Sequence, residues 1–239
     1  MASDVILVTG GAGYIGAHLV RKLLARGAQV RVLEKHLYGT QGLDDIRDNP
    51  NLEICEGDIC SPTDMADAVR GTRAVIALAA LVGDPACALD EQETMRVNFD
   101  STRVLIDACR AADVGRLVFA SSCSVYGANG DGMLTETSAL NPVSLYARTR
   151  IMSEELLLAE RGSVEVIILR LSTVCGTSPR MRLDLMVNTI TARAVMDGQI
   201  RIVGASQWRP HIHTADAAEA FLQAALDAPA SAAAGGIYN

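Results

Sequence analysis

Short β-rich runs alternate with longer segments of helical spacing along nearly all of the 239-residue chain. Several of the runs are almost entirely apolar, which is typical of strands covered by helices on both faces. The alternation predicts an α/β fold, with right-handed βαβ units forming a doubly wound parallel sheet. The strand-like runs are residues 5–8, 30–34, 52–56, 74–78, 117–120, 164–169 and 200–203. The helical segments are residues 14–26, 61–70, 91–112, 144–160, 183–196 and 215–226.

Composition and charge exclude several classes of protein. The 21 basic and 28 acidic side chains give a net charge of −7. No run of Lys or Arg supplies the basic face that nucleic-acid phosphates require. The longest apolar run, residues 74–82, is about half as long as a membrane-spanning helix. The N-terminus also lacks the pattern of a secretory signal. We therefore expect a cytoplasmic protein with no nucleic-acid or membrane partner.

The cysteines and histidines do not predict a metal site. The six cysteines form no CxxC pair and are expected to be reduced thiols. His211 and His213 form an HxH sequence, but no third ligand lies nearby in the chain.

A glycine-rich turn directly follows the first strand-like run and opens the first helical segment. Its spaced glycines are Gly10, Gly13 and Gly16, with Tyr14 and Ile15 between the last two. The first glycine allows a tight turn, the second lets a pyrophosphate approach the backbone, and the third allows close helix–strand packing. The helix N-terminus then offers free N–H groups to the phosphates. This context favours dinucleotide binding over a purely structural turn.

Acidic residues end the second and third strand-like runs. Glu34 ends the second run, 18 residues after Gly16. A carboxylate there binds ribose hydroxyls and repels a 2′-phosphate, which predicts NAD rather than NADP, although the adjacent Lys35 weakens the preference. The alternative interpretation of Glu34 is a solvated charge at a strand end. Asp58, after the third run, fits an adenine contact and a helix cap equally well.

A tyrosine, an arginine and a serine suggest proton transfer beside the cofactor. Tyr146 and Arg150 are four residues apart in a helical segment and therefore share a face. Because a fixed cation favours the phenolate, we expect the pKa of Tyr146 to lie below its ordinary value of about 10. Ser122, at the end of the fifth run, is positioned to bind the same substrate oxygen. With a nicotinamide, this set interconverts an alcohol and a ketone. Each residue alone is more typical of a surface tyrosine or a strand-end serine.

Together these motifs resemble the extended short-chain dehydrogenase/reductase superfamily, in particular its NAD-dependent nucleotide-sugar epimerase/dehydratase branch, which includes UDP-glucose 4-epimerase. The resemblance implies a Rossmann NAD-binding domain over residues 1–170. It also implies a partial substrate-binding lobe over residues 171–239, packed on that domain and with segments that return to it. The matching segments occur in family order and are residues 9–16, 57–59, 78–80, 98, 121–127, 146–150 and 209–214.

The resemblance implies roles for individual residues and a nucleotide-diphosphate sugar as substrate. Ser122, Tyr146 and Arg150 form the implied catalytic set. The implied cofactor contacts are Gly10, Gly13, Tyr14, Ile15, Gly16, Glu34, Lys35, Asp58, Ile59, Leu78, Ala79, Ala80, Asn98, Tyr146 and Arg150. The implied substrate contacts are Ser122, Cys123, Ser124, Tyr146, Thr173, Arg182 and Arg209, of which Arg209 matches the arginine that holds the diphosphate.

Three positions depart from the family pattern. Arg150 gives YxxxR in place of YxxxK, and its guanidinium is longer and forked. The Asp-Glu pair of 4,6-dehydratases is replaced by Cys123-Ser124, which supplies no good acid or base at neutral pH. Thr173 stands where many relatives have an Asn that binds the diphosphate.

These departures predict an NAD-dependent nucleotide-sugar 4-epimerase-like enzyme and leave alternatives open. A 4-ketoreductase or dehydrogenase of deoxysugar synthesis needs the same residues, and Arg150 also fits a weakly active or non-catalytic NAD-binding relative. We further expect a homodimer, because residues 91–112 and 144–160 carry apolar positions on more than one face. The end of the chain, residues 237–239, resembles the start of another strand, as expected if the substrate lobe is shortened.

Overall fold

The computed structural model describes residues 5–37, 39, 41–128, 132–202, 208–229 and 235–239, which fold around a seven-stranded sheet. The strand order is β3-β2-β1-β4-β5-β6-β9, and every neighbouring pair is parallel. The strands are β1 (Val5–Thr9), β2 (Gln29–Glu34), β3 (Leu52–Glu56), β4 (Thr72–Ala77), β5 (Arg116–Ser122), β6 (Glu165–Leu171) and β9 (Gly236–Tyr238). The predicted doubly wound α/β class is confirmed. The order reverses between β1 and β4, where such sheets open a ligand crevice at the carboxyl ends of the strands.

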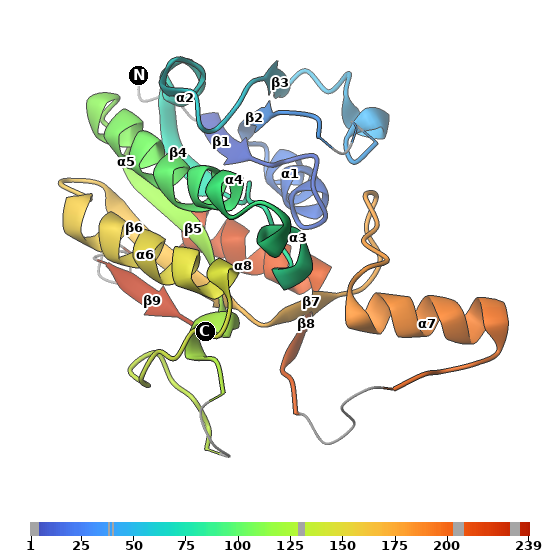
Figure 1. Ribbon diagram of the computed structural model, residues 1–239. Coiled ribbons are helices and arrows are strands. Elements are labelled where there is room, and N and C mark those ends of the chain that lie inside the picture. The colour runs from blue at the N-terminus through green and yellow to red at the C-terminus, as the bar shows by residue number, and fades with distance from the viewer. Residues whose placement is uncertain (1–4, 38, 40, 129–131, 203–207, 230–234) are drawn as a thin grey trace.

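Helices cover both faces of this sheet (Figure 1). On one face lie α1 (Gly16–Ala25) and α8 (Thr214–Leu226), and on the other lie α2 (Pro62–Val69), α5 (Ser101–Ala111) and α6 (Leu145–Glu160).

Each helical layer closes over its own apolar cluster. Ile6 of β1 and Phe221 of α8 are fully buried in one cluster. Leu7, the next residue of β1, is fully buried in the other cluster with Leu157 of α6. Because successive strand residues point to opposite faces, a strand buried on both sides must be apolar at almost every position.

A side-chain cap fixes where α6 begins. Ser144 has an extended backbone, and its hydroxyl accepts a hydrogen bond from the Ala147 N–H at 3.2 Å. Such a cap satisfies one of the N–H groups that the first helical turn leaves without a partner. Tyr146 is therefore held in the first turn of α6, at the crevice end of the sheet.

Several elements near the crevice were absent from the sequence prediction. The helix expected over residues 91–112 is divided into α4 (Glu91–Met95), a π-helical turn at Arg96–Asp100, and α5. A short helix α3 (Asp84–Leu89) precedes α4. The HxH sequence forms β8 (His211–His213), which pairs in parallel with β7 (Thr173–Cys175) in a separate two-stranded sheet.

The strand predicted over residues 200–203 is wrong at its first three positions. Residues 200–202 lie outside any strand, and Ile200 and Ile202 are 57% and 64% exposed. Val203 lies outside the described residues. The alternation of apolar residues there resembles a strand, but within the described chain no neighbouring strand pairs with it.

The part of the chain after β6 is divided in space. The helix α7 (Met186–Asp197) projects away from the central sheet (Figure 1). In contrast, α8 and β9, which follow α7 in the sequence, pack on and join the central sheet. Within the described residues, no helix combines the length and apolar character needed to cross a membrane.

Candidate active site

The glycine-rich turn connects β1 to α1 at the crevice. Gly10 has φ +73°, and a Cβ at this residue would lie 2.9 Å from the Ala79 nitrogen. A Cβ at Gly16 would collide with the Gly10 carbonyl oxygen and lie 2.7 Å from the Gly11 Cα. Side chains are therefore excluded from a backbone cradle at the start of α1. Such a cradle fits the pyrophosphate of a dinucleotide.

The residues predicted for the adenosine end lie together after β2 and β3. The Glu34 carboxylate accepts a hydrogen bond from the Ala12 N–H at 3.2 Å, so it is tied to the glycine-rich turn. Lys35 donates to Asp58 Oδ2 at 2.7 Å. Burial opposes ionisation of Asp58, but hydrogen bonds from Lys35 and from the Cys60 N–H outweigh it and lower the pKa of this carboxyl. Lys35 therefore pairs with Asp58, which limits its ability to attract a 2′-phosphate.

A cleft of about 360 Å³ runs from this end to Tyr146, within the size range of ligand sites. It brings together most of the predicted cofactor and substrate residues. Those that line it are Gly10, Gly13, Tyr14, Ile15, Gly16, Glu34, Lys35, Asp58, Ile59, Leu78, Ala79, Ala80, Ser122, Tyr146, Arg150, Thr173 and Arg182. The predicted residues outside this lining are Asn98, Cys123, Ser124 and Arg209.

Burial outweighs the charge of Arg150 in setting the acidity of Tyr146. The Arg150 guanidinium carbon lies 5.3 Å from the centre of the Tyr146 ring. Burial nevertheless raises the pKa of Tyr146, and the nearby guanidinium only partly offsets this effect. The expectation that Tyr146 ionises below its ordinary pKa is therefore wrong for the protein without ligand. The reason is that desolvation of the phenolate exceeds its attraction to Arg150.

Arg150 is a buried cation that no carboxylate neutralises among the described residues. Its side chain donates to the carbonyl oxygens of Ala120 and Asn98, both at 3.2 Å, and also stacks against Phe119. Its Nε is buried and has no hydrogen-bond partner within the described part of the chain. Burial lowers the pKa of this guanidinium. Arg150 thus offers a positive charge and a free donor at the inner wall of the cleft.

Asn98 helps to hold Arg150 in place at this wall of the cleft. Its side chain accepts from the Leu81 N–H and donates to the Leu81 carbonyl, both at 2.9 Å. Its carbonyl oxygen accepts from Arg150 and from the Ser153 hydroxyl, the latter at 2.9 Å. The π-helical turn carries this carbonyl, and such turns are frequent at functional sites. Asn98 lines a small cavity of about 20 Å³ beside the cleft.

Ser122 is the last residue of β5, and Cys123 and Ser124 begin the turn that follows it. The Ser122 hydroxyl accepts from the Ser124 N–H at 3.2 Å. Burial raises the pKa of Cys123, with Arg209 opposing it, so this residue is a protonated thiol at neutral pH. The Ser124 hydroxyl is buried and unpartnered among the described residues. This turn therefore contains hydroxyl groups but no carboxylate.

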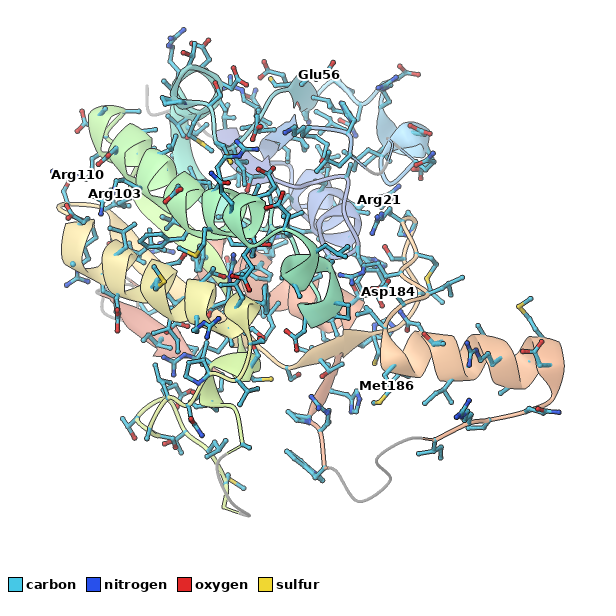
Figure 2. The ribbon with its side chains drawn as sticks, in the orientation of Figure 1. Arg21, Glu56, Arg103, Arg110, Asp184 and Met186 are labelled. Carbon is cyan, nitrogen blue, oxygen red and sulfur yellow. The ribbon has the colours of Figure 1, made fainter. Side chains whose placement is uncertain are left out.

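The segment after β7 is joined to the glycine-rich turn by contacts that the sequence did not reveal. The Tyr14 hydroxyl donates to the Gly176 carbonyl at 2.6 Å and accepts from Asn188 of α7 at 3.0 Å. Arg182 pairs with Asp184 at the entry to α7, where Figure 2 labels Asp184. No pattern in the sequence links Tyr14 to residues more than 160 positions away.

The whole described cleft lies within a match to one family profile. The profile of the NAD-dependent epimerase/dehydratase family matches residues 6–239. The chain belongs to this family. The resemblance to the extended short-chain dehydrogenase/reductase superfamily and its nucleotide-sugar branch is thereby confirmed.

Similar proteins in this family include dehydrogenases and dehydratases. D-erythronate dehydrogenase of Cupriavidus necator is 37% identical over 184 residues, which cover 71% of this chain and 55% of that protein. The sterol-4-alpha-carboxylate 3-dehydrogenase of Mus musculus is 34% identical over 154 residues, or 63% of this chain and 40% of that protein. The chain thus spans about half the length of these curated relatives.

A solved structure covers almost the whole chain. The dTDP-glucose 4,6-dehydratase of Streptomyces venezuelae, crystallised with NAD, superposes with a TM-score of 0.87 at 28% identity. The superposition covers 98% of this chain and 74% of the dehydratase. The family is NAD-dependent, in agreement with the predicted cofactor.

Proposed function

We propose that this protein is an NAD-dependent nucleotide-sugar 4-epimerase-like enzyme. The observation that carries the proposal is that Tyr146, Arg150 and Ser122 line the same cleft as the glycine-rich turn. Acid–base residues next to a dinucleotide cradle are what alcohol–ketone interconversion requires.

The cradle and the ends of β2 and β3 support NAD as the cofactor. Gly10, Gly13 and Gly16 would hold the pyrophosphate, and Glu34 would bind the adenosine ribose. NAD bound there would supply the hydride acceptor and donor that the reaction at the sugar carbon needs. The buried Nε of Arg150, which has no hydrogen-bond partner among the described residues, would supply a donor where the family lysine stands.

The chain's own residues handle the proton. Tyr146 takes the proton of the sugar hydroxyl and returns it, while Ser122 hydrogen-bonds the same oxygen. Arg150 favours the phenolate, which is needed because burial raises the pKa of Tyr146. The turn at Cys123 and Ser124 carries no carboxylate acid or base, which favours epimerisation or ketone reduction over water elimination.

Three arginines support a nucleotide diphosphate as the part of the substrate that is recognised. Arg180 and Arg182 line the cleft. Arg209 lies close enough to Cys123 to oppose the rise in the pKa of that thiol. A guanidinium fork suits phosphate oxygens.

We also propose that residues 171–239 contribute to the substrate lobe. We propose further that the protein is cytoplasmic.

The test is turnover of a panel of UDP-, dTDP- and GDP-hexoses in the presence of NAD. We expect one or more 4-epimers to form, and Tyr146→Phe to abolish their formation. Tyr238→Phe is the matched control, because Tyr238 is an exposed residue of the edge strand β9 and does not line the cleft. This variant should retain the activity. If the wild type and Tyr146→Phe give the same residual rate on every sugar, the catalytic proposal fails and a non-catalytic NAD-binding protein is favoured.

A second candidate is a 4-ketoreductase or dehydrogenase that exchanges its cofactor at each turnover. The similarity to D-erythronate dehydrogenase favours it. Purified protein that retains NAD and needs none added supports the epimerase. Protein that consumes added NAD or NADH stoichiometrically supports the dehydrogenase.

The preference for NAD over NADP is tested by calorimetric titration with both cofactors. We expect tighter binding of NAD, and Glu34→Ala should narrow the difference by about 1–3 kcal/mol, the contribution of one charged hydrogen bond. Equal affinities in the wild type would contradict the role of Glu34.

We also propose a homodimer through α5 and α6. Val104 and Ile151 are half-buried on these helices. Within one chain, Arg103 and Arg110 of α5 lie 3.8 and 3.7 Å from Glu160 of α6, so ion pairs hold the two helices side by side (Figure 2). Light scattering that finds only monomer at micromolar concentration would contradict this proposal.

A further inference from the structure

A buried ion pair packs against the turn at Cys123–Tyr126, which follows Ser122 and is here called the catalytic turn, and the pair takes no part in the proposed chemistry. Glu154 of α6 and Arg170 of β6 each have only 3% of the side chain exposed. Arg170 Nε lies 3.1 Å from Glu154 Oε1, and Arg170 Nη2 lies 2.6 Å from Oε2. The pair is therefore bidentate and buried.

This pair connects the strand that bears Ser122 to the helix that bears Tyr146. Glu154 also accepts a hydrogen bond from the hydroxyl of Ser121, the residue before Ser122. Ser121 lies directly opposite Arg170 in the β5–β6 ladder. Along α6, Glu154 follows Arg150 by four residues and Tyr146 by eight, on the same side of the helix.

Arg170 holds the other side of the catalytic turn. Its Nη1 donates to the Tyr126 hydroxyl at 2.8 Å and its guanidinium lies 5.0 Å from the centre of the Tyr126 ring. Tyr126 ends the 3₁₀ turn at Cys123–Tyr126 that begins after Ser122. One ion pair thus contacts the residue before Ser122 and the residue that closes its turn.

Stability alone does not account for such a pair. Apolar residues of similar volume at a buried ion pair are often neutral or stabilising, because they avoid the desolvation of two charges. Charged, bidentate hydrogen bonds also fix the orientation of the two side chains that form them.

We propose that Glu154 and Arg170 are positioning residues that fix Ser122 relative to Tyr146. This inference rests on the proposed function, in which those two side chains act on one substrate oxygen. Removal of the pair should lower kcat and leave KM nearly unchanged, because nucleotide recognition lies elsewhere in the cleft.

The main test is the double variant Glu154→Leu/Arg170→Met, which leaves no buried charge without its partner. Its matched control is Glu165→Leu/Arg116→Met, which removes the ion pair at the opposite end of the same two strands, where Arg116 Nη2 lies 2.8 Å from Glu165 Oε2. We expect the first variant to fold and lose about 10²-fold in kcat, as displacements near 1 Å do, with KM within about twofold. The control should retain the wild-type kcat.

A readout without turnover separates this inference from the proposed function. The ¹³Cζ resonance of Tyr146, assigned by its loss in Tyr146→Phe, should move in the first double variant and not in the control. Ser121→Ala keeps the ion pair and removes the hydrogen bond from Ser121 to Glu154. It should lower kcat and shift the resonance by smaller amounts than the first double variant does.

Wild-type kcat and an unmoved resonance in the folded double variant overturn the positioning role. If that variant does not fold, the same result in Ser121→Ala overturns it. A wild type without turnover refutes the proposed function, and the resonance alone then decides the positioning role.

Discussion

Arg150 and Arg170 have the same side chain and nearly the same burial, at 3% exposure each, yet their surroundings differ in one respect. Arg170 faces the carboxylate of Glu154, whereas Arg150 faces two carbonyl oxygens and two aromatic rings. Burial lowers the pKa of Arg150. Burial also acts to lower the pKa of Arg170, but the hydrogen bonds and charges of Glu154 and Tyr126 together outweigh it and raise that pKa. A neutralised cation holds structure in place. Arg150 pairs with no carboxylate among the described residues, and its positive charge acts on Tyr146, whose pKa it lowers against the effect of burial.

The largest expected effect comes from breaking the neutralised pair. Glu154→Leu leaves Arg170 buried without its carboxylate, which should lower the free energy of unfolding by about 3–5 kcal/mol. Urea denaturation followed by circular dichroism measures the loss. A variant as stable as the wild type would mean that the buried charge of Arg170 does not need the carboxylate of Glu154.

The matching substitution at the other arginine should act on rate instead of stability. Arg150→Met removes a charge that pairs with no carboxylate among the described residues. No buried counter-charge is left behind, so the free energy of unfolding should fall by less than in Glu154→Leu. The proton transfer loses its cation, and kcat should fall by about 10²-fold or more. The same urea assay and the hexose assay check both halves. A large loss of stability with an unchanged kcat would mean that Arg150 has a structural role and not a catalytic one.

The smallest of the rate effects concerns the identity of the cation. Arg150→Lys replaces a forked guanidinium with a compact ammonium that leaves more room beside Tyr146. We expect turnover to rise by a few-fold, measured under the same conditions as the wild type. A fall would indicate that the bonds from Arg150 to Ala120 and Asn98 are needed to hold the charge in place.

The sequence predicted the inner strands of the central sheet well because most of their residues are buried, on both faces of the sheet. Val5–Thr9 and Glu165–Leu171 show this as short apolar runs. It failed for β7 and β8, three-residue strands that lie 38 positions apart in the chain, because such short segments carry no period. It also mistook the exposed alternation at Ile200 and Ile202 for a strand, since a pattern does not reveal whether a neighbouring strand exists.

The candidate site was predicted where motifs are local and missed where contacts are distant. The glycine-rich turn, Ser122 and Tyr146 follow from neighbouring residues. The bond between Tyr14 and Asn188 joins parts of the chain that only the fold brings together. Arg170 did leave a signal, a charge inside an otherwise apolar strand, and such a charge calls for a partner. The sign of the Tyr146 pKa shift was missed because the four-residue spacing shows the cation and not the burial.

Titration of Tyr146 in the protein without ligand shows whether the charge of Arg150 acts on it. Because burial raises its pKa, Tyr146 should remain neutral at pH 7 and ionise only above its ordinary value of about 10. Its phenolate fraction then rises with pH, and Arg150→Met should move this titration to still higher pH, since the opposing cation is gone. The ¹³Cζ resonance of Tyr146 followed against pH in both proteins gives the comparison. An identical titration in the wild type and in Arg150→Met would mean that the charge of Arg150 does not act on Tyr146.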